Sequence, residues 1–214
     1  KRGILESYEK EVGRLQVSVC RLQEPNPLSP AQEKAYGEIH EAFKTKEVCL
    51  LHGVTSSGKT EIYVRLIHEV LRLGRQVLYM LPEIAITTQI TERLAKLFGD
   101  KLLVYHSKFS DNERVEVWNK LLHNDEPMLV LGVRSSLFLP FKDLGLIIVD
   151  EEHENTYKQQ DPAPRYHARN AAIVLAGMHG GKTLLGSATP SIDSYFKDMQ
   201  RPSSAKLWHI PQPP

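Results

Sequence analysis

Short apolar runs alternate with amphipathic segments along most of the chain. The apolar runs have the length of strands and span residues 48–51, 77–81, 102–105, 128–133, 144–149 and 183–186. The segments between them have helical spacing and span residues 62–71, 84–98, 112–122 and 168–178, with a last short helix predicted over 191–199. Strands that are apolar on both faces must be covered on both faces. The pattern therefore predicts an α/β fold, a parallel sheet flanked by helices on both faces, with ligands at the carboxyl ends of the strands.

A helix start with its own cap precedes the first of these strands. Ser29 suits the N-cap, Pro30 the first turn, and Gln32 the third helical position, where its side chain completes a capping box. This helix is predicted to run to about residue 43 and to bury Ala35, Ile39, Ala42 and Phe43. Residues 1–28 before it are predicted to be a linker or the tail of an upstream domain.

The sequence GVTSSGKT occupies residues 53–60, between an apolar run and a helical pattern. Strand, glycine-rich loop and helix in this order predict a phosphate-binding loop, because backbone N–H groups and the positive end of the helix can surround phosphate oxygens. Lys59 is placed to reach the outer phosphates and the Thr60 hydroxyl to hold Mg²⁺. A loop that only turns the chain is the alternative. The predicted nucleotide-binding residues are Gly53, Thr55, Ser56, Ser57, Gly58, Lys59, Thr60 and Glu61.

Three carboxylates end the fifth apolar run. Asp150 comes first and is predicted to hold the Mg²⁺ of the nucleotide, and Glu151 beside it to orient the attacking water. Lys59, Asp150 and Glu151 are therefore the predicted catalytic residues. Glu152 and His153 follow and are candidates for reporting the state of the γ-phosphate to another surface. The alternative is an acidic strand end that faces solvent.

Composition and charge limit the class of protein. The 214 residues are 41% hydrophobic and 25% charged, which is typical of a globular domain. No apolar run approaches the roughly 18–20 residues of a membrane-spanning helix, and two distant cysteines, Cys20 and Cys49, form no metal pattern or disulfide framework. We therefore predict a cytoplasmic protein with no membrane partner. The net charge of +1 is low for a nucleic-acid-binding protein, although a local groove can be basic on a neutral protein.

A further short motif, Ser187-Ala188-Thr189, follows the last strand of the predicted sheet. The order of GxxxxGKT, DEEH and SAT resembles that of superfamily 2 helicases and translocases. Longer motifs are similar to those of the bacterial replication-restart DNA helicases: LPEIA from Leu81, GVRSSLF from Gly132, DEEHE from Asp150, YKQQ from Tyr157, RYHAR from Arg165 and LGSATPS from Leu185. The resemblance covers about residues 28–198.

This resemblance implies the first RecA-like lobe of a 3′→5′ DNA helicase, a P-loop NTPase fold over residues 29–199, with a connector over 200–214 towards a second lobe. It implies ATP and Mg²⁺ as cofactors and the unwinding of DNA at stalled forks to restart replication. The implied partners are single-stranded and forked DNA, primosome proteins and single-strand-binding proteins. A second lobe, with its catalytic arginine and zinc-binding cysteines, is missing. We therefore expect the fragment to bind nucleotide, to hold no zinc and to hydrolyse ATP poorly.

The resemblance also assigns roles to single residues. Gln32 matches a glutamine that reads adenine, with helix capping as the alternative. Arg134 and Ser135 match a motif that touches the DNA backbone, with a surface salt bridge as the alternative for Arg134. Residues 157–169 match a loop that couples DNA binding to ATP hydrolysis, where aromatic and arginine side chains stack on unpaired bases. The alternative is an ordered surface loop that packs Tyr166 on its own domain. The implied DNA-facing or coupling residues are Arg134, Ser135, Glu152, His153, Tyr157, Lys158, Arg165, Tyr166, His167, Arg169, Ser187 and Thr189.

Two residues depart from the family pattern. Ser56 stands where glycine is common, and its side chain would narrow the loop or strain a backbone with positive φ. Val133 stands where threonine is common. Two other functions stay open here. A different superfamily 2 translocase would lack the loop at 157–169, and a nucleotide-gated DNA-binding module would not need Glu151.

Overall fold

The computed structural model describes residues 22–54, 57–106 and 109–194, and the backbone of residues 207–210. Seven parallel strands form one sheet in the order β3-β4-β2-β5-β8-β1-β9. These strands are β1 Val48–Gly53, β2 Gln76–Met80, β3 Leu102–Tyr105, β4 Leu129–Gly132, β5 Leu144–Val149, β8 Lys182–Ser187 and β9 Leu207–Ile210. A separate antiparallel pair consists of β6 Lys158–Gln159 and β7 Tyr166–His167.

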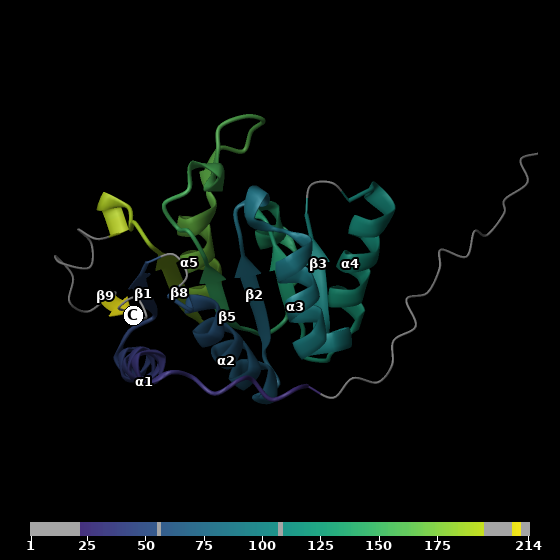
Figure 1. The fold of residues 1–214 in the computed structure, drawn as a ribbon. Helices are drawn as coiled ribbons and strands as arrows, with labels where there is room; N and C mark the ends of the chain where they lie inside the picture. The colour runs from purple at the N-terminus through teal and green to yellow at the C-terminus, as the bar shows by residue number, and fades with distance from the viewer. Residues whose placement is uncertain (1–21, 55–56, 107–108, 195–206, 211–214) are drawn as a thin grey trace, which may run out of the picture.

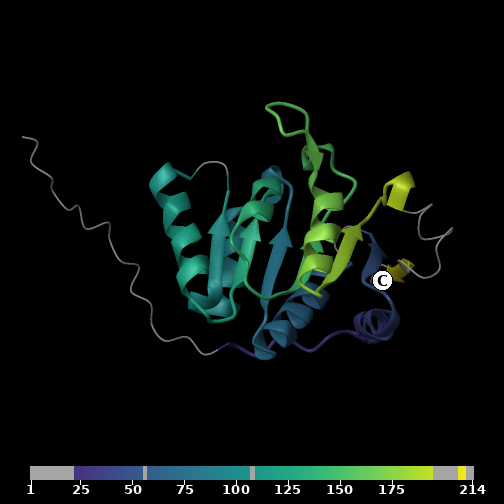
Figure 2. The same ribbon diagram turned by 180° about the vertical axis from the view of Figure 1, so that it is seen from behind.

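Helices cover both faces of the large sheet, as the apolar pattern predicted (Figures 1 and 2). One face packs against α1 Pro30–Thr45, α2 Lys59–Arg72 and α3 Thr88–Phe98, and the other against α4 Asp111–His123 and α5 Ala168–Met178. Alternate residues of β5 serve the two cores, since Leu146 and Ile148 pack on the first face while Ile147 and Val149 pack on the second. The fold is therefore a three-layer α/β/α domain with a parallel sheet.

The start of α1 confirms the predicted capping box. The Ser29 Oγ accepts a hydrogen bond from the Gln32 N–H at 3.4 Å, and the Gln32 Oε1 accepts one from the Ser29 N–H at 2.8 Å. Ala35, Ile39 and Ala42 are buried as predicted, whereas Phe43 is only partly buried. The cap is local chemistry, which explains why three residues sufficed to predict it.

The predicted single helix over 84–98 is wrong in its first turn. Residues 83–85 form a short 3₁₀ helix, η1 Glu83–Ala85, and α3 begins only at Thr88. The Thr87 Oγ1 caps α3 by accepting from the Ile90 N–H at 3.4 Å, and Ile86 before it has a non-helical ψ of 88°. A side-chain cap thus outweighs the continuous helical spacing. The end of the helix at Gly99, with φ of +55°, agrees with the prediction.

Three further 3₁₀ helices connect the main elements: η2 Gly99–Lys101, η3 Arg134–Phe138 and η4 Asn155–Tyr157. Of the short helix predicted over 191–199, residues 192–194 are helical, and the rest lies outside the described residues.

The C-terminal segment contains a strand that the sequence did not predict. Residues 200–214 were expected to be a connector, but β9 pairs in parallel with β1, with Leu50 opposite Leu207 and Gly53 opposite Ile210. An edge strand offers unpaired backbone N–H and C=O groups, and β9 uses those of β1. A four-residue strand at an edge leaves little periodic signal, so only the assembled sheet reveals it.

Residues 22–28 run along the first helical layer. The Gln23 N–H donates to the Leu97 carbonyl of α3 at 3.1 Å, and Leu22 packs against the core under that layer. The earlier part of the predicted linker lies outside the described residues, so the domain boundaries stay predictions. Among the described helices, none is both long and apolar enough to cross a membrane, and the cytoplasmic location also stays a prediction.

The sequence motifs come together because they follow neighbouring strands of the sheet. These strands lie side by side in the order β2, β5, β8 and β1. Because the strands are parallel, their carboxyl ends share one edge of the sheet. The phosphate loop follows β1, the DEEH sequence follows β5, and the SAT sequence begins at the end of β8. The green β6–β7 hairpin rises from this same edge (Figures 1 and 2).

Candidate nucleotide site and DNA-facing surface

The described residues of the phosphate loop follow β1 and lead into α2, where two features suit an anion. Gly58 is the N-cap of α2 and has φ of +81°, a conformation that glycine adopts without strain. The buried Lys59 Nζ donates to the Gly53 carbonyl at 2.6 Å. Thr55 and Ser56 lie outside the described residues, so the departure from the family pattern at Ser56 has no structural account.

A cavity of about 320 Å³ joins the phosphate loop to the acidic strand end. It is lined by Ser57, Gly58, Lys59, Thr60, Glu61, Arg93, Asp150 and Glu151. Only β8 separates β1 from β5 in the sheet, which explains how groups about ninety positions apart in the sequence share one cavity. The structure thus brings together all three predicted catalytic residues.

Asp150 is held by two tyrosines from different elements. The Tyr63 hydroxyl of α2 donates to Asp150 Oδ1 at 3.0 Å, and the Tyr79 hydroxyl of β2 donates to Oδ2 at 3.2 Å. The Glu151 N–H also donates to Oδ1, at 3.1 Å. Burial, and then the charge of Glu151, raise the pKa of Asp150 to about 6.

The residues of this cavity fit a phosphate chain with Mg²⁺. The buried Ser57 Oγ has no hydrogen-bond partner among the described residues, so it is free to donate to a phosphate oxygen. The Thr60 hydroxyl and the Asp150 carboxylate are the oxygen ligands that Mg²⁺ prefers, and both line the cavity. Nowhere in the described part of the chain do three or more His, Cys, Asp or Glu residues form a metal-binding group of their own.

Glu151 has an unusual backbone. Its φ of +48° is the only positive value among the described residues other than glycine. Such a conformation is uncommon for residues with a side chain and is often found at functional sites. The side chain is about a third exposed, and its Oε2 lies 3.6 Å from His153 Nδ1. This turn presents Glu151 to the cavity while the chain continues inward at Glu152.

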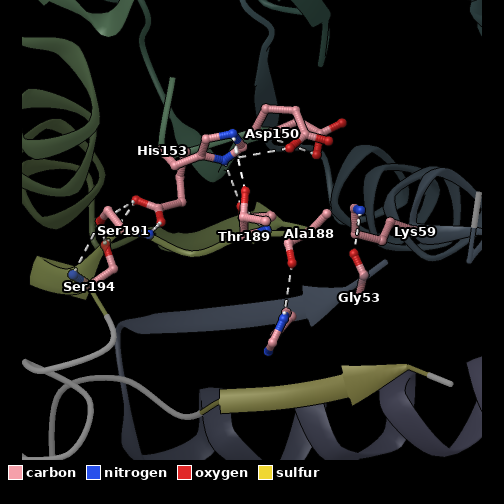
Figure 3. A network of polar contacts seen from close by, with 12 residues as sticks. Gly53, Lys59, Asp150, His153, Ala188, Thr189, Ser191 and Ser194 are labelled. Carbon is pink, nitrogen blue, oxygen red and sulfur yellow. Dashed lines mark hydrogen bonds and ion pairs between the residues drawn. The ribbon is translucent and has the colours of Figure 1, made fainter. Parts of the chain in front are cut away.

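His153 connects the acidic motif to the SAT motif. His153 Nδ1 lies 2.7 Å from the Ser187 Oγ, and its Nε2 lies 3.4 Å from the Thr189 Oγ1. The Ser187 Oγ also accepts from the Thr189 N–H at 3.0 Å. Figure 3 shows His153 and Thr189 pointing toward each other beside Asp150. The predicted coupling residues His153, Ser187 and Thr189 are therefore in direct contact.

Glu152 points away from the nucleotide cavity into the protein. It is fully buried, and its Oε2 lies 2.6 Å from Arg169 Nη1. The Ser191 N–H and the Ser194 Oγ donate to the same carboxylate at 2.6 and 2.9 Å. Burial would raise the pKa of Glu152, but these hydrogen bonds and the Arg169 charge hold it below its usual value. A direct contact with the γ-phosphate is therefore incompatible with this position.

Two members of the loop at 157–169 are buried rather than exposed. Tyr157 is 1% exposed, and its hydroxyl donates to the Asp150 carbonyl at 2.7 Å and to the Met80 carbonyl at 3.2 Å. Arg169 is 5% exposed and pairs with Glu152. Neither side chain presents a face for stacking on a base, so the stacking role expected for them is corrected. Their contacts instead link the hairpin to the acidic motif.

The other loop residues lie at the surface. Lys158 and Arg165 are exposed, whereas Tyr166 and His167 are half-buried. The Tyr166 ring packs edge-to-face on Phe138, with centroids 5.2 Å apart. Burial, followed by the nearby Arg169 charge, lowers the pKa of His167. These four side chains are available at the rim of the strand ends, beside the hairpin.

A second cavity, of about 470 Å³, lies between the ends of β2 and β4 and the hairpin. Arg134 and Ser135 line it together with Tyr105, Arg114 and Gln159. The Arg134 Nη1 donates to the Thr156 carbonyl at 3.0 Å. This main-chain contact holds the Arg134 guanidinium at the cavity, and its role in binding DNA stays a prediction.

Comparison with known proteins identifies the family. The family model described as DEAD/DEAH box helicase matches residues 29–197, most of the chain. The chain belongs to the DEAD/DEAH box helicase family. The matched residues contain the phosphate loop, the DEEH motif and the SAT motif described above, and the family implies the use of nucleotide and Mg²⁺. The chain is therefore a helicase motor lobe, and the cavity is its candidate nucleotide site.

Several individual proteins are similar to this chain at higher sequence identity, and they are replication restart proteins. The chain is 44% identical to the replication restart protein PriA of Bacillus subtilis over 201 residues, which cover 92% of this chain and 25% of that protein. It is 42% identical to PriA of Synechocystis, over 91% of this chain and 23% of the relative, and 46% identical to PriA of Haemophilus influenzae, over 78% and 22%. The chain spans about a quarter of the length of these relatives.

Solved helicase structures share the fold of this lobe. RecG bound to a three-way DNA junction matches with a TM-score of 0.60 and 23% identity, over 89% of this chain and 25% of that one. The Mycobacterium smegmatis helicase Lhr, bound to single-stranded DNA and AMP-PNP, matches with a TM-score of 0.62 and 19% identity, over 86% of this chain and 26% of that one. The RecA-like lobe implied by the sequence motifs is thereby confirmed as the fold.

The sequence did not point to three residues around the candidate nucleotide site: Arg93, which lines the cavity, and Tyr63 and Tyr79, which lie behind it on Asp150. Tyr63 and Tyr79 fall at apolar positions of a helix and a strand, so they looked like core residues. The Arg93 Nη2 lies 2.6 Å from the Glu61 Oε1 at the cavity. A helical spacing of four residues from Lys59 to Tyr63 was the one available signal, because it places both on the same side of α2.

Gln32 has a position that supports both of its suggested roles without deciding between them. Its Oε1 completes the α1 capping box, and its Nε2 donates to the Gly58 carbonyl at 3.2 Å. The side chain therefore connects the start of α1 to the phosphate loop. The adenine contact stays a prediction.

Proposed function

We propose that the chain is the first motor lobe of a 3′→5′ DNA helicase that uses ATP to unwind forked DNA during replication restart. One observation carries the proposal: the phosphate loop and the Asp150–Glu151 pair line a single cavity. Replication restart proteins that are 40–46% identical over most of this chain support the replication-restart role.

The proposed chemistry assigns one task to each cavity residue. Lys59 exchanges the Gly53 carbonyl for the outer phosphates, since an ammonium group gains more from phosphate charge than from a neutral carbonyl. Thr60 and Asp150 would hold Mg²⁺, which neutralises charge on the phosphates. Glu151 accepts a hydrogen bond from the attacking water and orients it.

We assign DNA contacts to the exposed rim of the strand ends. Arg134 and Ser135 supply phosphate partners, and Lys158, Arg165 and Tyr166 supply charge and a ring face on the hairpin. The proposed coupling runs through buried contacts. Movement of the hairpin would pull on the Asp150 main chain through Tyr157 and on the acidic motif through Arg169, while His153, Ser187 and Thr189 join that motif to the strand that follows.

Further components would come from other parts of a longer protein. Because the relatives are about four times as long as this chain, we propose that a second lobe supplies the arginine that stabilises transition-state charge, and that it also holds the zinc. Primosome proteins and single-strand-binding proteins are proposed partners of that whole protein.

The test uses Glu151→Gln in the full-length protein together with Lys59→Ala as a reference. We expect Glu151→Gln to keep nucleotide affinity and to lose ATP hydrolysis and unwinding, whereas Lys59→Ala loses nucleotide affinity as well. ATP hydrolysis and unwinding by Glu151→Gln at the wild-type rates would show that Glu151 is not catalytic. A DNA-stimulated rate of about 1–10² per second from the 214-residue chain alone would show that no second lobe is needed.

A further inference from the structure

Two buried tyrosines donate hydrogen bonds to the carboxylate proposed to hold Mg²⁺. The mechanism proposed above assigns no task to either of them. Tyr63 and Tyr79 are 0% and 1% exposed, and their rings meet edge-to-face with centroids 5.6 Å apart. Each hydroxyl donates to a different oxygen of Asp150. Buried phenols usually find a hydrogen-bond partner, but here both share one functional carboxylate.

The hydrogen bonds to Asp150 show which acceptor positions of its carboxylate are occupied. An ionised carboxylate offers about four lone-pair positions, two on each oxygen. Among donors in the described part of the chain, Oδ1 accepts from the Tyr63 hydroxyl and the Glu151 N–H, and Oδ2 accepts from the Tyr79 hydroxyl. One position on Oδ2 remains.

We propose that Tyr63 and Tyr79 are positioning residues that hold the Asp150 carboxylate in one rotamer, so that its remaining Oδ2 position receives Mg²⁺ or a water bound to Mg²⁺. The inference rests on the proposed function, because it assumes that Asp150 takes part in Mg²⁺ binding. The physical reason is that the last torsion of an aspartate is soft, and two donors on opposite oxygens fix the plane of the carboxylate. Partners of this kind set both the orientation and the affinity of metal-binding carboxylates.

The neighbouring strand is built to admit this arrangement. Gly186 of β8 lies against the Tyr63 hydroxyl, and a Cβ atom at this position would overlap with that oxygen. The same Cβ would lie 3.0 Å from Tyr63 Cζ and 3.1 Å from Asp150 Oδ1. Any residue other than glycine would therefore displace the Tyr63 hydroxyl from the carboxylate. Gly186 and Ser187 are the last two residues of β8. The end of this strand therefore contacts both Tyr63, through Gly186, and His153, through Ser187.

The test measures how the affinity of the 214-residue chain for a fluorescent ATP analogue depends on Mg²⁺, from EDTA to millimolar Mg²⁺. We expect Tyr63→Phe and Tyr79→Phe to bind the analogue in EDTA with the wild-type affinity. In both variants, the Mg²⁺ concentration that gives half of the Mg²⁺-dependent increase in affinity should be about tenfold higher. Asp150→Asn is the reference for complete loss of the Mg²⁺ response. Tyr36→Phe is the matched control, because the Tyr36 hydroxyl bonds to Glu69, which does not line the nucleotide cavity.

The outcomes separate this inference from the proposed function. If the wild type shows no Mg²⁺ response, or if Asp150→Asn keeps it, the metal-binding role of Asp150 fails and the inference fails with it. If Asp150→Asn loses the response while both tyrosine variants keep the wild-type Mg²⁺ dependence, only the inference is overturned.

Gly186→Ala provides a second route should a tyrosine variant fold poorly. Gly186→Ala removes no polar group from the site, but its methyl group displaces the Tyr63 hydroxyl. We expect a Mg²⁺ defect similar to that of Tyr63→Phe, and little further defect when the two changes are combined. A wild-type Mg²⁺ dependence in Gly186→Ala, with thermal unfolding showing a folded chain, would contradict the role assigned to Tyr63.

Discussion

Asp150 and Glu152 are two residues apart at the end of the same strand, yet their carboxylates have different partners. The side chains that donate to Asp150 are neutral, whereas Glu152 pairs with a charged arginine. Asp150 accepts hydrogen bonds from two neutral phenols, while burial and then the Glu151 charge raise its pKa to about 6. Glu152 accepts from an arginine, a backbone N–H and a serine hydroxyl, and its pKa falls below its usual value. The left-handed turn at Glu151 directs the two side chains to different places.

The difference teaches how one short acidic sequence can serve two purposes, the proposed binding of Mg²⁺ and the holding together of two segments. A carboxylate that must bind a cation benefits from neutral partners, because a fixed positive charge would compete with the metal. A carboxylate that must hold two segments together benefits from a charged partner, since a buried charge needs compensation. Asp150 has the first environment and Glu152 the second, and four predictions test this division.

The largest expected effect follows from removing Glu152. Glu152→Ala leaves the Arg169 guanidinium buried without its carboxylate, and we expect the free energy of unfolding to fall by about 3–5 kcal/mol. Urea denaturation followed by circular dichroism measures the change. Lys142→Ala is the control, because its pair with Asp125 lies at the surface, and we expect no measurable change there. A loss for Glu152→Ala as small as that of the control would show that the network does not hold the fold.

The next effect concerns the tyrosine side of the comparison. Gly186→Ala introduces a methyl group where the Tyr63 hydroxyl lies, and overpacking of this kind lowers the free energy of unfolding by about 1–3 kcal/mol. We expect a smaller loss from the same change in a Tyr63→Phe background, since the displaced oxygen is then gone. A double-mutant cycle measures the coupling, and strictly additive losses would mean that Gly186 acts through another contact.

The third prediction uses acid to sharpen the contrast. Because the pKa of Glu152 is lower in the folded protein than its usual value of 4.5, its ionisation stabilises the fold above that pH, and the stabilisation is lost as the pH falls through the lower folded pKa. Wild type should therefore lose stability below about pH 4.5 more steeply than Glu152→Gln, by at most about 1.4 kcal/mol per pH unit. Urea midpoints over that range give the slopes. Glu126→Gln, at an exposed site, controls for the loss of one charge, and equal slopes in all three proteins would contradict the prediction.

The smallest effect concerns Tyr157, whose hydroxyl donates to the main-chain carbonyl of Asp150. Tyr157→Phe removes the donor to the Asp150 carbonyl, and we expect a loss of about 1 kcal/mol in the free energy of unfolding. The Met80 carbonyl keeps the Asp150 N–H as a donor, which limits the loss. Thermal and urea unfolding measure it against Tyr36→Phe. A loss comparable to that of Glu152→Ala would mean that Tyr157 belongs to the same cooperative network.

Local patterns were enough to predict most elements of the fold. The strands and helices follow from apolar spacing, and the α1 cap follows from Ser29 and Gln32 alone. The start of α3 was wrong because the Thr87 side chain competes with helical spacing, and β9 was missed because an edge strand depends on the neighbour that it pairs with. Both failures come from interactions that a periodic pattern does not record.

The candidate site also has features that follow from local sequence and others that depend on tertiary contacts. The sequence by itself determined the phosphate loop, the acidic motif and their order, because glycine flexibility, lysine charge and carboxylate chemistry act within a few residues. Only the tertiary structure decided that Tyr63 and Tyr79 would meet Asp150, across 87 and 71 positions of the chain, and that Tyr157 and Arg169 would be buried. These contacts depend on which strands are neighbours in the sheet. Strand order is set by the packing of the whole domain and not by any one segment.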